Sequence, residues 1–328
     1  VAEEAEFLAR VRENYAERDY LKPAHGVFRS VDEFLSSGRL DRYTNVSSRN
    51  FFSARGVSLD ELDQTLVPLM RVIYDQELEA HAATALVSLT SVVDPGSVSS
   101  GNSELPVAMI RNANASLHLN TTVSSISWTG STFTVESLPT VSSIDESRLP
   151  VETVYDAVVL AAPMEFLNVT FQNVTLPHVP QRNFTKWFVT IVVARAINPV
   201  FFNLPPNATV PYDNILTTHN ASATTPWHVL QLVAPARDGR FIWKLFSNAD
   251  VQSEVAKFFT DIRETHVQAW PYTFPHLLPL EDDVLQPIVL APGLFNLNAL
   301  ESFASAMEVS TVAGRNAARL LADFLDLA

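Results

Sequence analysis

The stretch Leu294-Phe-Asn-Leu-Asn-Ala-Leu-Glu301 decides the fold, together with the small-residue stretch from Ser302 to Leu321 that follows it. The pattern predicts a short apolar strand that runs into a helix. Backbone amides at the start of such a helix can approach a ligand closely and present the positive end of the helix dipole to it. The segment therefore predicts either a ligand site at the helix start or a terminal unit whose small residues allow close packing.

The composition predicts a large core and few loops that lie against phosphate groups. The chain has 328 residues, and 47% of them are hydrophobic, which is enough for two domains or one elaborated domain. It contains 20 Pro and only 9 Gly, so rigid turns outnumber the positions where backbone can touch a phosphate. A complete dinucleotide-binding loop is not expected in it.

Charge and residue types exclude several classes of partner. The formal net charge of −14 disfavours binding to nucleic acid or to an anionic membrane surface. No apolar run reaches the roughly 20 residues of a membrane-spanning helix. Cysteine is absent, and the 8 His lack the spacing of metal ligands. We expect no metal site and no transmembrane segment, and nothing in the sequence predicts a protein partner.

Asn-x-Ser/Thr sequons are more frequent than the roughly three expected from random placement. They begin at Asn45, Asn114, Asn120, Asn168, Asn173, Asn183, Asn207 and Asn220. One interpretation is N-glycosylation in the secretory pathway, with a lysosomal, vacuolar or extracellular destination. The alternative is that polar loops rich in Asn, Ser and Thr inflate the count.

Hydrophobic periodicity changes along the chain. The hydrophobic pattern of residues 1 to about 92 predicts helices, and this region includes a capping box at Ser58-Leu-Asp-Glu61. From residue 116 the period becomes two, which predicts an antiparallel β unit with a hairpin turn at Thr129-Gly130. The apolar run from Val154 to Ala161 predicts a central strand buried on both faces. Further on, alternating strands predict a sheet that is covered by a helix over residues 250–264.

Several segments, taken in order, resemble one protein family. They are Pro68-Leu-Met-Arg-Val-Ile-Tyr-Asp-Gln76, Ala85-Leu-Val-Ser-Leu89, Ser100-Gly-Asn102, Tyr155-Asp-Ala-Val-Val-Leu-Ala-Ala-Pro163, Ile215-Leu-Thr-Thr218, Ile242-Trp-Lys-Leu-Phe-Ser247, Ser305-Ala-Met-Glu-Val-Ser310 and Asn316-Ala-Ala318. The set is similar to the prenylcysteine oxidases, FAD-dependent thioether oxidases that are also called prenylcysteine lyases. The resemblance runs essentially from end to end.

The resemblance implies an α/β fold with an α+β insert, in which a partial FAD-binding Rossmann-like domain of the flavin amine-oxidase-like type carries a substrate domain. It assigns residues 1–98 to the helical part of the substrate domain and 99–163 to an FAD-domain segment with the β unit. Residues 164–284 become the substrate-domain sheet, and 285–328 the C-terminal FAD-domain strand and helix. The family's N-terminal Gly-x-Gly-x-x-Gly turn has no counterpart, so we expect the C-terminal two-thirds of such an enzyme, inactive alone.

The resemblance also implies contacts with FAD, carried over residue by residue. The implied contacts are Gly101, Asn102, Val123, Ala161, Ala162, Pro163, Glu301, Ala306 and Met307. The family's Gly-Gly pair is Ser100-Gly101 here, which departs from the pattern at the point of close approach to the flavin. For the Val and Ala positions, the alternative is ordinary core packing.

The activity implied by the resemblance is oxidative cleavage of farnesyl- or geranylgeranyl-cysteine during the degradation of prenylated proteins. Oxygen is the electron acceptor, and the products are a prenyl aldehyde, cysteine and hydrogen peroxide. Aromatic stretches at 187–188, 201–202 and 270–275 could line an apolar slot or belong to a core. Arg71 and Lys244 are candidates for binding the substrate head group or for structural ion pairs. No catalytic side chain is identified.

Two other functions remain open. An amine or polyamine oxidase of the same architecture would need a Lys near the flavin, for which Lys186 is the nearest candidate. A non-catalytic, secreted glycoprotein that binds isoprenoid lipid without flavin is the second alternative. Flavin binding and the choice between farnesylcysteine and benzylamine as substrates distinguish the three.

Overall fold

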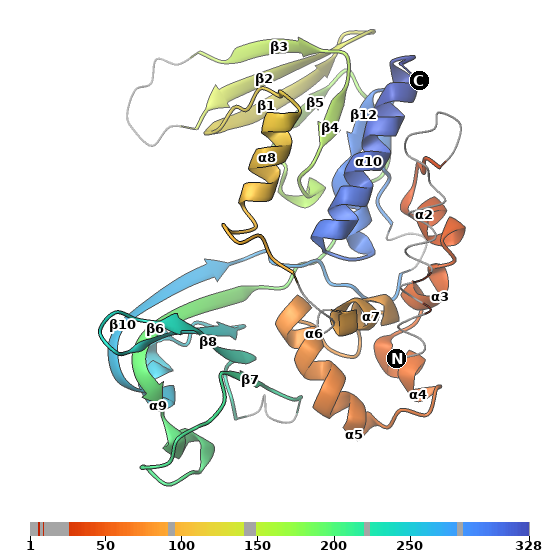
Figure 1. The fold of residues 1–328 in the computed structure, drawn as a ribbon. Helices are drawn as coiled ribbons and strands as arrows, with labels where there is room; N and C mark the ends of the chain where they lie inside the picture. The colour runs from red at the N-terminus through yellow and green to blue at the C-terminus, as the bar shows by residue number, and fades with distance from the viewer. Residues whose placement is uncertain are drawn as a thin grey trace.

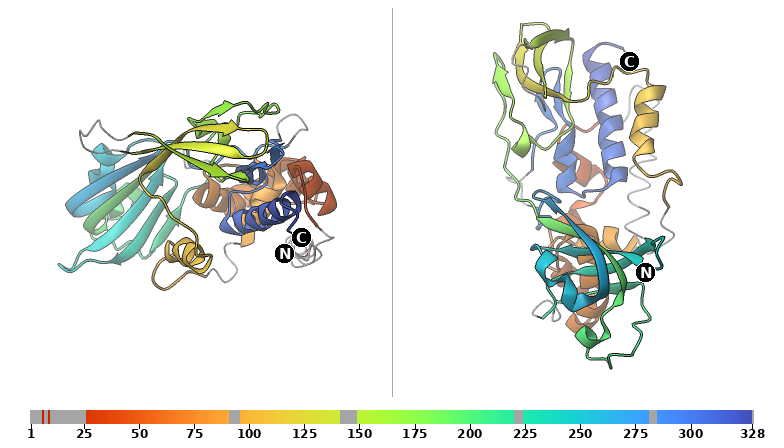
Figure 2. Two further views of the ribbon diagram at one scale, coloured as in Figure 1. Left: turned by 90° about the horizontal axis from the view of Figure 1, so that it is seen from above. Right: turned by 90° about the vertical axis from the view of Figure 1, so that its left-hand side faces the viewer.

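The chain forms two bodies, one above the other in Figure 1. A computed structural model describes residues 6, 9, 26–90, 96–140, 149–219, 224–280 and 285–327. The upper body contains two small sheets with helices α8 and α10, and the lower body contains a five-stranded sheet beside helices α4 to α7 (Figures 1 and 2). This mixture of sheets and helices confirms the predicted α/β class.

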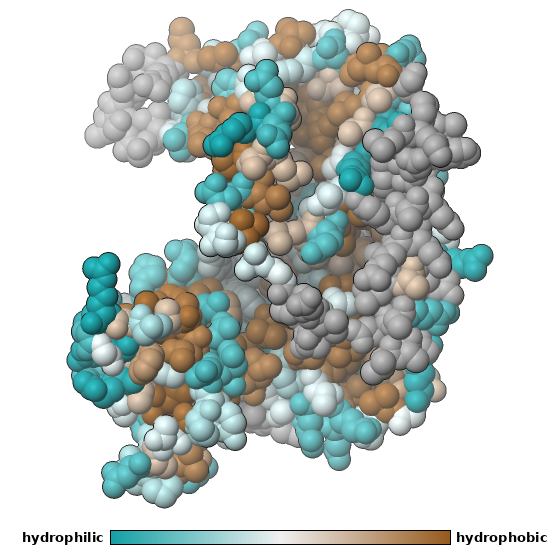
Figure 3. Space-filling model, in the orientation of Figure 1, coloured by the Kyte–Doolittle hydropathy of each residue, from teal (hydrophilic) through white to brown (hydrophobic). Residues whose placement is uncertain are grey.

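The predicted helices are confirmed over residues 26–90, most of residues 1–25 lie outside the described chain, and one further helix follows at 104–112. The elements are α2 (Val31–Ser37), α3 (Asp41–Thr44), α4 (Ser48–Ser53), α5 (Leu59–Glu61), a π-helical turn (Leu62–Leu66), α6 (Val67–Tyr74), α7 (Ala82–Thr90) and α8 (Glu104–Asn112). The predicted capping box is confirmed: the Glu61 backbone N–H donates to Ser58 Oγ, and the Ser58 N–H donates to the Glu61 carboxylate. Helix α8 buries none of its residues and exposes apolar side chains (Figure 3).

The upper body contains two sheets. One has the order β3-β2-β1-β5 and is formed by β1 (Thr121–Trp128), β2 (Phe133–Pro139), β3 (Val151–Tyr155) and β5 (Thr170–Gln172). The other has the order β11-β12-β4 and is formed by β11 (Val289–Ala291), β12 (Leu294–Asn296) and β4 (Val158–Leu160). Strands β12 and β4 run parallel, with Leu294 opposite Val158 and Asn296 opposite Leu160.

The prediction of one buried central strand from Val154 to Ala161 is wrong. The run is divided between β3 and β4, which belong to different sheets, and every residue of β3 is exposed. Apolar composition indicated burial, but β3 pairs only with β2 at the edge of its sheet within the described chain. The helix predicted directly after residue 301 also begins later, because a 3₁₀ segment (η7, Leu297–Ser302) precedes α10 (Met307–Phe324).

The lower sheet is antiparallel, with the order β10-β6-β9-β8-β7. Its strands are β6 (Trp187–Ile197), β7 (Asn214–Leu216), β8 (Val229–Pro235), β9 (Phe241–Ser247) and β10 (Phe259–Trp270). The helix predicted over 250–264 is wrong, because only α9 (Val255–Phe258) is helical beyond a 3₁₀ turn and β10 follows directly. The long ladder between β10 and β6 outweighs the helical periodicity of this segment.

One hydrophobic cluster connects the N-terminal helices with the C-terminal part of the described chain. Phe34 and Leu86 from the N-terminal helices share one buried cluster with Leu300 and Phe303. The Asn316 side chain of α10 donates to the Phe28 carbonyl at 2.8 Å and accepts from the Phe28 N–H at 2.9 Å. Among the residues that the structure describes, no helix combines the length and apolar character that a membrane crossing needs.

We expect Gly293→Ala to destabilise the fold by about 2–4 kcal/mol, because left-handed backbone disfavours Ala and the new methyl would clash. Gly293 has φ +75°, and a Cβ there would lie 2.8 Å from the Phe324 ring and 3.2 Å from Phe133. Gly314 in α10 has no such neighbour within 4 Å, so Gly314→Ala should stabilise by about 0.5–1 kcal/mol. Urea unfolding of both variants measures the difference, and similar effects would contradict it.

Candidate functional site

Polar side chains gather beyond the carboxyl ends of the parallel strands β4 and β12. Glu165 lies in a 3₁₀ turn (η2, Met164–Phe166) directly after β4, and Asn298 and Glu301 lie in η7 directly after β12. The carboxyl ends of parallel strands meet at one edge of a sheet, where α/β proteins bind their ligands. The parallel pairing therefore brings two short segments that are distant in sequence to one site.

Arg182 joins the two segments. Its Nε and Nη2 donate to the two oxygens of Glu165 at 2.7 and 3.0 Å, and Nη2 also donates to Asn298 Oδ1 at 2.6 Å. Nη1 donates to the Asn298 carbonyl at 3.2 Å and lies 3.9 Å from Glu301 Oε2. The side chains of Arg182 and Glu165 are only 8% and 5% exposed. This buried, bidentate ion pair fixes both segments against each other.

Gln286 and Asn296 extend the network into the upper body. The Gln286 amide donates to Glu165 Oε1 and to the Pro180 carbonyl, both at 2.8 Å, and Asn296 Nδ2 donates to Gln286 Oε1 at 3.2 Å. Burial by itself would raise the pKa of the Glu165 carboxyl. The hydrogen bonds and charge of Arg182 outweigh burial and lower that pKa below its ordinary value, so Glu165 stays ionised.

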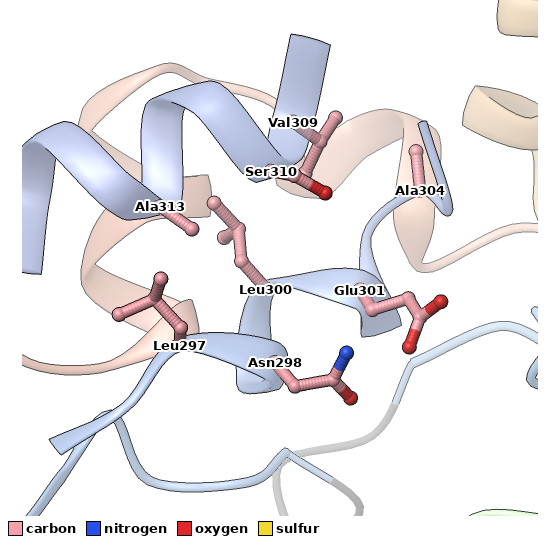
Figure 4. A pocket seen from close by; sticks show the side chains of 8 residues that line it. All are labelled: Leu297, Asn298, Leu300, Glu301, Ala304, Val309, Ser310 and Ala313. Atoms are coloured by element: carbon pink, nitrogen blue, oxygen red, sulfur yellow. The ribbon is translucent and has the colours of Figure 1, made fainter. Parts of the chain in front are cut away.

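A small pocket lies between η7 and the start of α10. Figure 4 shows its lining residues, Leu297, Asn298, Leu300, Glu301, Ala304, Val309, Ser310 and Ala313. Glu301 Oε1 accepts from Ser305 Oγ at 2.6 Å, whereas Glu301 Oε2 is buried without a hydrogen-bond donor among the described residues. At the helix start, Ala306 is extended and no side chain caps the first amides. The pocket thus offers acceptors to hydroxyl groups and free amides to a negative charge.

Only some of the predicted cofactor contacts come together at this site. Pairing of β4 with β12 brings the segment 161–163 to the same sheet edge as Glu301, and Ala306 and Met307 begin the neighbouring helix. Gly101 and Asn102 instead lie in an exposed turn before α8, where Asn102 Oδ1 accepts from the Val98 N–H at 2.9 Å. Val123 is half-buried in β1. Their roles as FAD contacts stay predictions.

Arg71 is buried, and its Nε, Nη1 and Nη2 atoms all donate to protein groups. Its guanidinium pairs with Glu77 and donates to Thr217 Oγ1 at 3.1 Å and to the Thr218 carbonyl at 2.8 Å. These bonds join α6 to the end of β7. A substrate carboxylate would have to compete with Glu77 for Arg71, so the observed contacts support a structural role, and the head-group role stays a prediction.

Lys244 lies on β9 and differs from Lys186 in its surroundings. Each ammonium lies over a Phe ring two residues further on, at 4.8 Å from Phe246 for Lys244 and 4.7 Å from Phe188 for Lys186. Lys186 is exposed, whereas Lys244 is half-buried and burial lowers its pKa. No carboxylate among the described residues forms an ion pair with Lys244, so it is available to an anionic ligand.

An aromatic cluster borders the polar network. Phe166 and Tyr272 stack with ring centroids 4.1 Å apart, Phe184 lies 4.7 Å from Phe166, and the Arg182 guanidinium is 5.6 Å from the Phe184 ring. Phe166 and Tyr272 are exposed. Of the aromatic stretches considered for an apolar slot, 270–275 contributes to this cluster. Phe201 and Phe202 instead pack near Trp227 in the core of the lower sheet.

Seven of the eight sequon asparagines are exposed, and Asn220 lies outside the described residues. Exposure is what a glycan requires, but glycosylation stays a prediction.

Arg182, Glu165 and Asn298 were not predicted as site residues from the sequence. A signal was present for two of them: Glu165 and Asn298 each follow a short apolar strand within a few residues, where parallel strands place ligand-binding groups. Arg182 had no such signal, because it lies in a Pro-rich connection and reaches the site only through the tertiary fold.

The fold and the strand-end site define a class, that of proteins with the flavin amine-oxidase fold. Putrescine oxidase bound to putrescine matches with a TM-score of 0.53 and 12% identity over 98% of this chain and 73% of that chain. A mutant of that enzyme matches with a TM-score of 0.54 and 12% identity over 100% and 75%. At this identity the likeness shows the fold alone.

The family model described as prenylcysteine lyase matches residues 11–326, so the chain belongs to the prenylcysteine lyase family. Prenylcysteine oxidase 1 of Homo sapiens is 27% identical over 324 residues, which cover 93% of this chain and 62% of that protein. Farnesylcysteine lyase of Arabidopsis thaliana is 23% identical over 318 residues, covering 96% and 60%. The chain thus spans about three-fifths of the length of these relatives.

We expect Glu165→Gln to lower the free energy of unfolding by about 3 kcal/mol, because it removes the bidentate partner of the buried Arg182 charge and leaves only the Glu301 carboxylate, 3.9 Å away. Glu79→Gln is a matched control, since the Arg49–Glu79 pair has an N–O distance of 2.6 Å but side chains that are 43% and 61% exposed. That control should change stability little. Urea unfolding at neutral pH measures both, and equal effects would show that burial of the pair is unimportant.

The stabilisation from Glu165 should also depend on pH. Its pKa in the folded protein is below the ordinary value of 4.5, so its contribution is complete above that value and is lost as the pH falls through the folded-state pKa. The stability difference between wild type and Glu165→Gln should therefore shrink in acid. Unfolding free energies at about pH 6.5, 4.5 and 3 measure this trend, and a constant difference would count against it.

Proposed function

We propose that this chain carries part of an FAD-dependent oxidase that cleaves the thioether bond of farnesyl- or geranylgeranyl-cysteine. The products are a prenyl aldehyde, cysteine and hydrogen peroxide, with water and oxygen consumed. The observation that carries the proposal is the family match over residues 11–326. We further propose that the reaction belongs to the degradation of prenylated proteins in the secretory pathway, a lysosome or vacuole, or outside the cell, which the exposed sequons support.

The polar groups around the strand-end pocket are of the kinds that would hold the ribityl hydroxyl groups of FAD, and the start of α10 is of the kind that would hold its diphosphate. The buried Glu301 Oε2 receives no hydrogen bond from the described residues and would suit a hydroxyl donor, and the amides at the start of α10, which no side chain caps, would suit an anionic group. When bound, FAD supplies the acceptor for the hydride that leaves the prenyl carbon next to sulfur. Arg182 would hold Asn298 and Glu165 in place, which keeps the pocket formed.

One face of the lower sheet fits the substrate. Val189, Ile191, Ile242 and Phe246 surround Lys244 on this face, and all are half-buried, unlike the opposite face, which is covered by α9. Ring contacts continue from Phe246 to Trp187 at 4.4 Å and from Trp187 to Phe274 at 5.6 Å. Burial of a prenyl chain on such a surface contributes about 0.8 kcal/mol per methylene. The chain's residues thus position the thioether and exclude water, while Lys244 would neutralise the substrate carboxylate.

The test mixes the chain with FAD, desalts it and adds farnesylcysteine without oxygen. Retained flavin whose visible absorption is then lost would support the oxidase and would overturn the expectation that the chain is inactive alone. Benzylamine is the control substrate and should leave the absorption unchanged. Bleaching by benzylamine alone would favour an amine oxidase. Farnesylcysteine binding without flavin retention would favour the non-catalytic isoprenoid-binding alternative for this chain.

A further inference from the structure

Three polar residues lie next to one another across one face of the lower sheet, where Asn214 is exposed and the other two are half-buried. Asn214 on β7 is opposite Gln231 on β8, and Gln231 is opposite Lys244 on β9. Directly opposed residues on antiparallel strands have Cβ atoms about 4.5–5.5 Å apart and point to the same face. Asn214, Gln231 and Lys244 therefore form a polar row on a face that is otherwise apolar at its centre.

An apolar row runs parallel to the polar row, two residues along each strand. It consists of Leu216, Val229, Phe246 and Val189, which are opposed in the same register. Two residues along a strand correspond to about 7 Å. The Lys244 ammonium lies 4.8 Å from the Phe246 ring, at the boundary between the two rows.

Two members of the polar row, Lys244 and Gln231, have groups that could bind an anion. Lys244 is half-buried, its pKa is lowered by burial alone, and no described carboxylate pairs with it. A bound carboxylate would restore the stabilisation that the ammonium loses on leaving water. The Gln231 side chain is half-buried and makes no hydrogen bond with the described residues, so its amide has both a donor and an acceptor to offer.

We propose that Gln231 and Lys244 form the subsite for the amino-acid head group of the substrate, with Lys244 binding the carboxylate and the Gln231 amide binding the carboxylate or the ammonium. The adjacent apolar row receives the first carbons of the prenyl chain. This inference rests on the proposed function. It names Gln231 as a specificity-determining residue and assigns the carboxylate to Lys244 rather than to Arg71, whose donors are already used by Glu77, Thr217 and Thr218.

The test compares binding of farnesylcysteine and its methyl ester, measured by isothermal titration calorimetry. For the wild-type chain, we expect the ester to bind about tenfold more weakly, because it lacks the negative charge. In Lys244→Met the two ligands should bind equally, at about the affinity of the ester for wild type. Gln231→Leu should weaken binding of farnesylcysteine by about three- to tenfold. Lys186→Met is the matched control, since its ammonium has the same ring contact but is exposed, and should bind like wild type.

The outcomes separate this subsite from the function on which it rests. Equal affinity of acid and ester for the wild-type chain would overturn the subsite and leave the oxidase proposal standing. Persistent discrimination in Lys244→Met would assign the carboxylate to another cation and would also overturn it. Absence of binding by either ligand to the correctly folded wild-type chain, as judged by circular dichroism, would instead contradict the proposed function.

Discussion

The buried pair between Arg182 and Glu165 is the interaction on which the arrangement of the site depends. Strands β4 and β12 are each only three residues long, and such a short parallel pair supplies few hydrogen bonds. The guanidinium adds bonds to both segments that follow these strands. Both side chains are buried, so separating the two charges would leave each without its partner away from water. The energetic cost of that separation keeps Arg182 and Glu165 in their observed positions. The ion pair therefore limits how far the two segments at the strand-end pocket can move relative to each other.

The two faces of the lower sheet have different surroundings. The face that carries Trp243 and Leu245 is sealed by α9 and neighbouring aromatic side chains, and it provides the core. The other face alternates with it residue by residue along the same strands, yet remains half-buried and contains an ammonium. A period of two thus lets one strand contribute both to the core and to the face that we propose binds the substrate. This division explains why Lys244 can lie beside Trp243 in sequence without entering the core.

Short sequence motifs correctly predicted the features that are formed by residues close together in the chain. The capping box at Ser58 and the hairpin after Trp128 were both predictable, because their hydrogen bonds close within a few residues. The α/β class and the family also followed from the sequence. The helix predicted over residues 250–264 failed because β10 is stabilised by pairing with β6, which begins more than sixty residues earlier. Part of the site was missed for the same reason: Arg182 acquires its partners only when distant segments meet.

The hydrogen bonds between Phe28 and Asn316 span 288 positions of the chain. During synthesis, the helices that contribute Phe34 and Leu86 to the shared core leave the ribosome long before Leu300 and Phe303 exist. Because translation proceeds at about 5–20 residues per second, these apolar faces wait for tens of seconds without their partner. Helix α10 lines the strand-end pocket and also contributes Ala313 and Leu320 to this shared core. Apolar surface that is exposed before its distant partner is synthesised is the kind of surface that chaperones cover.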